Sequence, residues 1–276
     1  MERERRHIRV TGTVQGVGFR PFVYRTAVEL GLDGHVANDS LGVLIEAEGT
    51  RAALDELCRR LTDQPPPLAR VTAVDSAGLP CNGGERGFRI VVSRDAGSPD
   101  VPVSVDVAPC PACLAELRDP ADRRYRYPFI NCTDCGPRYT ITRRIPYDRP
   151  HTTMAGFVMC PPCQAEYDDP ADRRFHAQPN ACPGCGPRTV LCDPSGTPQA
   201  RGDAALHATV ARLLAGEVLA VKGVGGFHLA VDATSAGAVA ELRRRKARDD
   251  KPFALLVSDL AAARRLVALH PDAAAA

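Results

Sequence analysis

Eight of the eleven cysteines form four CxxC pairs, and this spacing is the clearest chemical signal in the sequence. Two such pairs supply the four thiolates of a closed tetrahedral zinc site, which has no coordination position left for water. We therefore expect two structural zinc ions. Disulfides and an iron centre are the alternatives, and reduced thiols in the cytosol disfavour the disulfides. The expected ligands are Cys110, Cys113, Cys132 and Cys135 for one ion, and Cys160, Cys163, Cys182 and Cys185 for the other.

The cysteines belong to a repeat with an offset of 50 positions, "CPACLAELRDPADRRYRYPFINCTDCGPR" at 110–138 and "CPPCQAEYDDPADRRFHAQPNACPGCGPR" at 160–188. A duplication favours one metal site within each repeat, and a cross-braced pairing is the alternative. Each repeat also contains an Arg pair that could contact nucleic acid. Two Asp residues precede each pair and cancel most of its field, so we do not expect a nucleic-acid partner. With eight cysteines available, His151 and His176 are not expected to bind metal.

A second candidate site lies in "VQGVGFRPF", where two glycines precede an arginine and a proline. Backbone N–H groups of a glycine-rich turn, a helix N-terminus and an Arg fork together favour a phosphoryl group. No Gly-Lys-Ser/Thr follows, so the turn is not a Walker loop. An ordinary strand-to-helix turn is the alternative reading of the turn alone. The expected phosphate-binding residues are Gln15, Gly16, Val17, Gly18, Phe19 and Arg20.

The surrounding elements predict how this loop is held. "HIRVTGTV" is strand-like, and a helix is expected from Pro21 to Gly31. Two extended runs follow within 35–49, then a helix with Leu54, Leu57, Cys58 and Leu61 at helical spacing. Strands at 70–78 and 87–93 complete a βαββαβ order, a split βαβ sandwich, within an expected domain of residues 1–95.

"VTGTVQGVGFR" followed by "GHVANDSLG" resembles the acylphosphatase family. The resemblance implies that Arg20 binds phosphate and that Asn38 orients the attacking water. His35 stands where the family usually has an aromatic residue, beside the site. An acyl phosphate is already activated, so positioning water and neutralising charge would suffice for its hydrolysis.

The last part, residues 199–276, predicts a helix ending near Gly216, a strand at 217–223, a glycine-rich turn and a basic helix. A further strand is expected in "KPFALLVSD" at 251–259. This part is similar to the start of the YrdC/Sua5 nucleotide-binding family. That resemblance implies ATP contacts from Lys222, Lys246, Arg248 and Lys251. The alternative reading of "RRRKAR" is a solvated helix terminus.

The sequence contains no apolar run long enough to span a bilayer, and "MERERRHIRV" places charge where a signal peptide needs an apolar core. We therefore expect a cytoplasmic protein without a membrane partner. The net charge of +2 indicates no particular partner. The excess of Arg over Lys is attributed to composition bias.

The order of these parts, with the zinc module at 100–192, resembles the HypF family of carbamoyltransferases in [NiFe]-hydrogenase maturation. The resemblance implies an α+β protein: an acylphosphatase-like sandwich, a four-cysteine zinc-repeat module and an incomplete YrdC-like α/β segment. It implies that carbamoyl phosphate is hydrolysed to carbamate, that ATP converts carbamate to carbamoyl adenylate, and that HypE receives the carbamoyl group on its C-terminal cysteine. A generic acylphosphatase with a zinc interaction module, and an RNA-binding protein related to tRNA modification, are the alternatives.

Overall fold

The computed structural model describes residues 3–81, 86–93, 102–270 and 272. The chain divides between Thr189 and Val190 into two compact units, and each is described separately here. The boundary expected between residues 95 and 100 lies outside the described residues.

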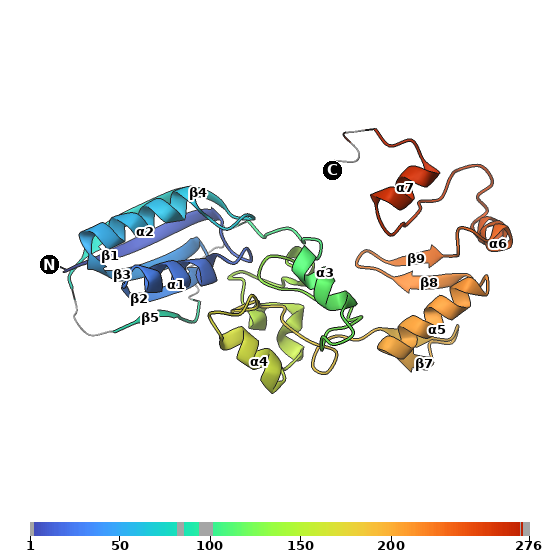
Figure 1. The fold of residues 1–276 in the computed structure, drawn as a ribbon, viewed down its shortest axis with the longest axis horizontal. Coiled ribbons are helices and arrows are strands. Elements are labelled where there is room, and N and C mark those ends of the chain that lie inside the picture. The colour runs from blue at the N-terminus through green and yellow to red at the C-terminus, as the bar shows by residue number, and fades with distance from the viewer. Residues whose placement is uncertain (1–2, 82–85, 94–101, 271, 273–276) are drawn as a thin grey trace. The chain divides into compact units, whose positions relative to one another are not determined.

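The first unit begins with a five-stranded sheet covered by two helices on one face (Figure 1). The strand order is β4-β1-β3-β2-β5, and all neighbours are antiparallel except β2 and β5. The parallel pairs β1/β2 and β3/β4 each have one strand between them, so β1-α1-β2 and β3-α2-β4 are two interleaved split βαβ units. Right-handed crossovers then place both helices on the same face. The elements are β1 (Arg3–Thr13), α1 (Phe19–Glu29), β2 (Asp33–Asp39), β3 (Gly42–Thr50), α2 (Arg51–Asp63), β4 (Arg70–Leu79) and β5 (Phe88–Ile90).

The core of this sheet domain follows from the predicted periodicities. Leu54, Leu57 and Leu61 of α2 are fully buried, as their helical spacing predicts, and each contributes roughly 2 kcal/mol by its burial. They meet the inward residues of β1, Ile8 and Val10, which are also fully buried. The predicted βαββαβ order and the α+β class are confirmed. The final strand is shorter than expected because regular pairing with β2 ends at Ile90.

The two cysteine repeats form the rest of the first unit, and residues 110–131 and 160–181 share the same secondary structure. Helices α3 (Pro111–Arg118) and α4 (Pro161–Asp168) each begin with a proline directly after a cysteine. Cys110 and Cys160 have φ of −70° and −71°, both with ψ of 162°. The connection between the repeats contains the short 3₁₀ helices η1 (Tyr139–Ile141), η2 (Arg149–His151) and η3 (Thr153–Gly156).

The second unit consists of two hairpins and three helices among its described residues. Its elements are β6 (Val190–Cys192), β7 (Pro198–Arg201), α5 (Asp203–Leu214), β8 (Leu219–Lys222), β9 (Phe227–Ala230), α6 (Ala236–Lys246) and α7 (Leu260–Leu266). The expected helix before Gly216 and the expected strand after it are present. No helix in the described part of the chain has the length and apolar character needed to cross a membrane.

The strand predicted at 251–259 is wrong. This segment has no regular secondary structure, and Leu256 within it is fully exposed. An extended run becomes a strand only when its backbone groups find a partner. Among the described residues, β8 and β9 pair with each other and no strand pairs with this segment.

Candidate active site and metal centres

The loop between β1 and α1 has a backbone that requires its two glycines. Gly16 and Gly18 have φ of 72° and 75°, a region that side-chain-bearing residues rarely adopt. A Cβ atom at Gly18 would also lie 2.6 Å from Cγ2 of Thr133, a residue of the first cysteine repeat. The loop is therefore shaped both by its own turn and by packing against the cysteine repeats.

The same loop presents free hydrogen-bond donors. Within the described residues, none of the hydrogen bonds is donated by the amide N–H groups from Gly16 to Arg20. These amides directly precede or begin α1, where the helix N-terminus adds partial positive charge. A concave group of free amides at a helix N-terminus is suited to an anion.

Arg20 and Asn38, the two expected catalytic residues, meet at one backbone carbonyl. Nη2 of Arg20 and Nδ2 of Asn38 lie 3.3 and 3.4 Å from the carbonyl oxygen of Tyr147. Both side chains are buried, and Oδ1 of Asn38 has no hydrogen-bond partner. A buried acceptor without a partner beside free amides is suited to a bound water.

These groups line one open pocket. One wall comes from the expected phosphate loop and Asn38. The other wall comes from the cysteine repeats and their connection: Thr133, Arg138, Tyr147, His176, Ala177, Gln178 and Pro179. The local sequence pattern gave no sign of this second wall, because its residues lie 113 to 164 positions from the loop.

The structure separates the six loop residues by role. Gly16, Gly18, Phe19 and Arg20 line the pocket, whereas Val17 packs in the hydrophobic core. Gln15 also lines it, but its amide is occupied: Nε2 donates to the carbonyls of Asp39 and Gly42, and Oε1 accepts from the Tyr147 amide at 2.9 Å.

Two histidines considered from the sequence lie in different places. His35 lines a separate small pocket with Asp33 and Glu46. His176 lies in the wall of the phosphate-loop pocket, with its ring centroid 4.8 Å from that of Tyr167. Burial, reinforced by the charge of Arg20, lowers the pKa of His176 to about 4, so the imidazole is neutral at pH 7.

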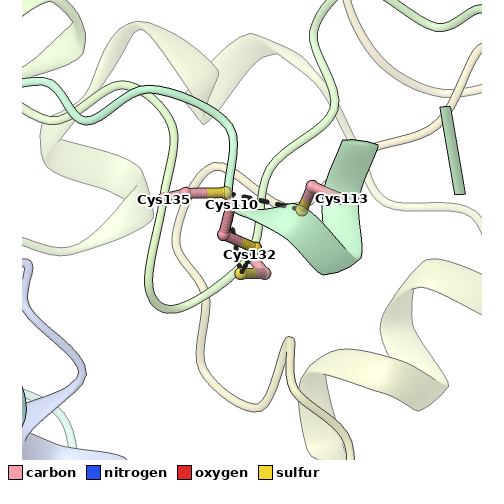
Figure 2. A group of neighbouring side chains, drawn as sticks. All are labelled: Cys110, Cys113, Cys132 and Cys135. Atoms are coloured by element: carbon pink, nitrogen blue, oxygen red, sulfur yellow. Dashed lines mark hydrogen bonds between the residues drawn. The ribbon is translucent and has the colours of Figure 1, made fainter. Parts of the chain in front are cut away.

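Each repeat gathers its own four cysteines into one cluster, in which all sulfur atoms lie within 4.8 Å of one another. Figure 2 shows the first cluster, with Cys110 and Cys113 at the start of α3 and Cys132 and Cys135 in the following loop. The cluster's hydrogen-bonded sulfur pairs are 3.4 to 3.8 Å apart, and those of the second cluster 3.6 to 3.7 Å.

These distances fit zinc. Four sulfurs at about 2.3 Å from a tetrahedral ion are about 3.8 Å from one another, whereas a disulfide has an S–S distance of about 2.05 Å. All eight cysteines are free thiols in the structure. The clusters are therefore consistent with two structural zinc sites, and the ligands group sequentially rather than across the repeats.

Each repeat also donates arginine hydrogen bonds to the other repeat's cysteines. Both terminal nitrogens of Arg173 donate to Sγ of Cys113 at 3.2 Å. Nη2 of Arg123 donates to Sγ of Cys163 at 3.3 Å. Four thiolates on Zn²⁺ would carry a net charge of −2, and the arginine from the other repeat offsets part of this charge. The neighbouring residues Arg124 and Arg174 are buried.

The buried arginines form reciprocal ion pairs across the repeats. Arg124 donates to Glu166 at 2.9 and 2.5 Å, and Arg174 pairs with Glu116. The Arg pairs considered for RNA binding are therefore engaged inside the zinc module. Glu116 and Glu166, the partners of these arginines, stand at equivalent positions of the two repeats in the sequence. The sequence did not show that each would contact the arginine of the other repeat.

We expect Glu166→Gln to lower the free energy of unfolding of the zinc module by about 2 kcal/mol, because it leaves the buried Arg124 without its anion. Burial opposes ionisation of Glu166, but the hydrogen bonds of Arg124 and Arg123 outweigh it and lower its pKa to about 2. Its contribution is therefore present above an unfolded pKa near 4.5 and is lost as the pH falls toward 2. Urea unfolding of Glu166→Gln, Glu116→Gln and the surface control Glu56→Gln measures this. Equal midpoints for all three would contradict the reciprocal pairing.

The residues expected to contact nucleotide lie in two parts of the second unit. Lys246 ends α6, and Arg248 follows it, donating to the carbonyls of Lys251 and Pro252 at 3.1 and 2.9 Å. Lys222 ends β8, with its ammonium 4.8 Å from the ring centroid of Phe227. In the described part of this unit, no hydrogen bond or ion pair joins Lys222 to the other three.

Comparison with known proteins defines the class. Residues 6–90 match the acylphosphatase family, residues 110–142 and 159–192 the HypF finger family, and residues 211–276 the Sua5/YciO/YrdC family, described as telomere recombination. An acylphosphatase from Salinibacter ruber is 43% identical over 83 residues, which are 30% of this chain and 86% of that protein. The first domain is therefore an acylphosphatase domain.

Longer relatives extend over nearly the whole chain. Carbamoyltransferase HypF2 of Cupriavidus necator is 58% identical over 93% of this chain and 32% of its own length. A crystal structure of full-length HypF in a phosphate- and nucleotide-bound form superposes with a TM-score of 0.89 at 43% identity, covering 99% of this chain and 35% of that one. The chain belongs to the HypF family and spans about a third of the length of these relatives. The resemblance inferred from the sequence is thereby confirmed.

Proposed function

We propose that the first unit hydrolyses carbamoyl phosphate to carbamate and inorganic phosphate. The observation that carries this proposal is the meeting of Arg20, Asn38 and the free amides of Gly16 to Arg20 in one pocket. The membership in the acylphosphatase and HypF families supports it.

In this mechanism the phosphoryl group binds against the loop amides, and the fork of Arg20 neutralises its equatorial oxygens. Asn38 orients a water through Oδ1, which has no protein partner. The water oxygen bonds to phosphorus while the bond from phosphorus to the acyl oxygen breaks. The electron pair leaves with carbamate, and a phosphoryl oxygen accepts the water proton. No side chain has to act as a strong general base, because the acyl phosphate is already activated.

The proposal also includes the two later steps, adenylation of carbamate and transfer of the carbamoyl group. The second unit, with Lys222, Lys246, Arg248 and Lys251, would contribute to an ATP site that adenylates carbamate. The nucleotide in the related full-length HypF structure supports nucleotide binding in this family. Sequence beyond this chain would pass the carbamoyl group to the C-terminal cysteine of HypE.

Phosphate release from carbamoyl phosphate, compared with acetyl phosphate, tests the substrate. We expect a higher kcat/KM for carbamoyl phosphate. Equal kcat/KM values would favour the generic acylphosphatase, and salt-dependent RNA binding without phosphate release would favour the RNA-binding alternative.

We expect Asn38→Ala to lower kcat by about tenfold to a hundredfold while leaving inhibition by inorganic phosphate nearly unchanged, because Asn38 acts on water rather than on phosphate. Steady-state kinetics with phosphate as a product inhibitor measure both effects. Asn38→Asp, which keeps the shape but adds a negative charge, should weaken phosphate inhibition as well. Normal turnover with lost phosphate binding in Asn38→Ala would reverse the roles of Asn38 and Arg20.

A further inference from the structure

The connection between the two cysteine repeats lines the phosphate pocket at Tyr147, and the next residue, Asp148, contacts Arg20. The Tyr147 amide donates to Oε1 of Gln15 at 2.9 Å, and its carbonyl accepts from Arg20 and Asn38. Oδ1 of Asp148 lies 2.7 Å from Nη1 of Arg20. A carboxylate therefore occupies one arm of the fork that is expected to bind phosphate.

The connection is held firmly on the side of the zinc module. The amide of Arg149 donates to Oε1 of Gln178 at 2.7 Å, and its guanidinium donates to the carbonyls of Gln178, Asn180 and Phe157 at 2.6 to 3.0 Å. Asp148 directly precedes this anchor, so its backbone is held next to Arg20.

The other ionisable groups of the pocket show why the contact between Asp148 and Arg20 affects phosphate binding. Arg138, the other arginine in the lining, already donates to the carbonyls of Gly16, Cys132, Thr133 and Cys135. His176 is neutral at pH 7 because its pKa is lowered to about 4. Among the described residues that line the pocket, Arg20 is therefore the cation left for an incoming anion, and Asp148 competes for it.

We propose that Asp148 determines the phosphate affinity of this site: its carboxylate competes with phosphate for Arg20 and is displaced when phosphate binds. This inference rests on the proposed function in taking Arg20 as the phosphate ligand. Like charges at one guanidinium repel each other, so the carboxylate weakens binding of the phosphate product and favours its release. The opposite role, in which Asp148 positions Arg20 for phosphate, predicts the opposite sign.

The test is calorimetric titration of the 276-residue chain with inorganic phosphate. Asp148→Asn keeps the shape, and Asp148 makes no side-chain capping bond that the substitution would remove. We expect Asp148→Asn to bind phosphate about tenfold more tightly or better, from Coulomb energies at a partly buried site. Asp148→Glu, which keeps the charge, and Asp63→Asn, which removes a surface charge on α2, should stay close to the parent.

Weaker or unchanged phosphate binding in Asp148→Asn would overturn the inference and indicate a positioning or purely structural role. Steady-state kinetics provide a second measurement. In Asp148→Asn, KM for carbamoyl phosphate and the inhibition constant of phosphate should fall together. A drop in kcat with no change in either constant would also overturn it. A parent chain that binds phosphate but does not hydrolyse carbamoyl phosphate would refute the proposed function alone, because the phosphate titrations would still test Asp148.

Discussion

Replacing Arg20 by alanine is expected to lower kcat/KM for carbamoyl phosphate by a factor of about tens to several hundred, or about 2 to 4 kcal/mol of transition-state stabilisation. The buried guanidinium is the pocket cation that can fork onto two phosphoryl oxygens. Arg20→Lys keeps the charge but loses the fork, so it should be nearly as damaging. Arg25→Ala, an exposed arginine of the same helix, is the matched control and should retain the parent kinetics.

The same substitution leaves Asp148 without its ion pair, so the folding of the variant must be verified. Zinc content and urea midpoints should stay close to the parent values, because the Arg149 anchor is untouched. A correctly folded Arg20→Ala variant with the parent kcat/KM would refute the assignment of Arg20 as the phosphate ligand.

Loss of zinc is expected to have the largest effect on stability. Binding of a structural zinc ion contributes about 10 to 16 kcal/mol in small zinc domains at pH 7, so chelation should unfold both cysteine repeats. The parent chain should contain two zinc ions, and Cys113→Ser should lose the first. Because Arg173 and Glu116 link this site to the other repeat, Cys113→Ser should also release the second ion more readily. Cys192→Ser, at an exposed cysteine outside the clusters, is the control.

Hydrolysis is expected to survive chelation, because Arg20 and Asn38 are carried by the sheet domain, which has its own core. Unfolding of the repeats would, however, remove the second wall of the pocket and the ion pair of Asp148 with Arg20. The phosphate affinity and KM should therefore change even where hydrolysis persists. One zinc per chain by elemental analysis, or complete loss of hydrolysis while the sheet domain stays folded, would contradict this account.

The sequence predicted what depends on local spacing. The CxxC pairs predict two clusters because each ligand is fixed by its neighbours in one repeat, and Gly16 and Gly18 predict a tight turn for the same reason. The contacts of Asp148 with Arg20 and of Arg124 with Glu166 could not be predicted, since each joins residues about 40 or more positions apart. The strand expected at 251–259 failed for a related reason: its composition favours a strand, but pairing requires a partner.

In the proposed mechanism, water attacks the phosphorus atom of an acyl phosphate bound at Arg20. Hydrolysis of carbamoyl phosphate in water labelled with the heavy oxygen isotope tests it directly, with mass spectrometry of the released phosphate. The account predicts one labelled oxygen in each phosphate, formed at a rate that falls in Arg20→Ala in proportion to kcat/KM. Unlabelled phosphate, or labelled phosphate formed equally fast without Arg20, would contradict it.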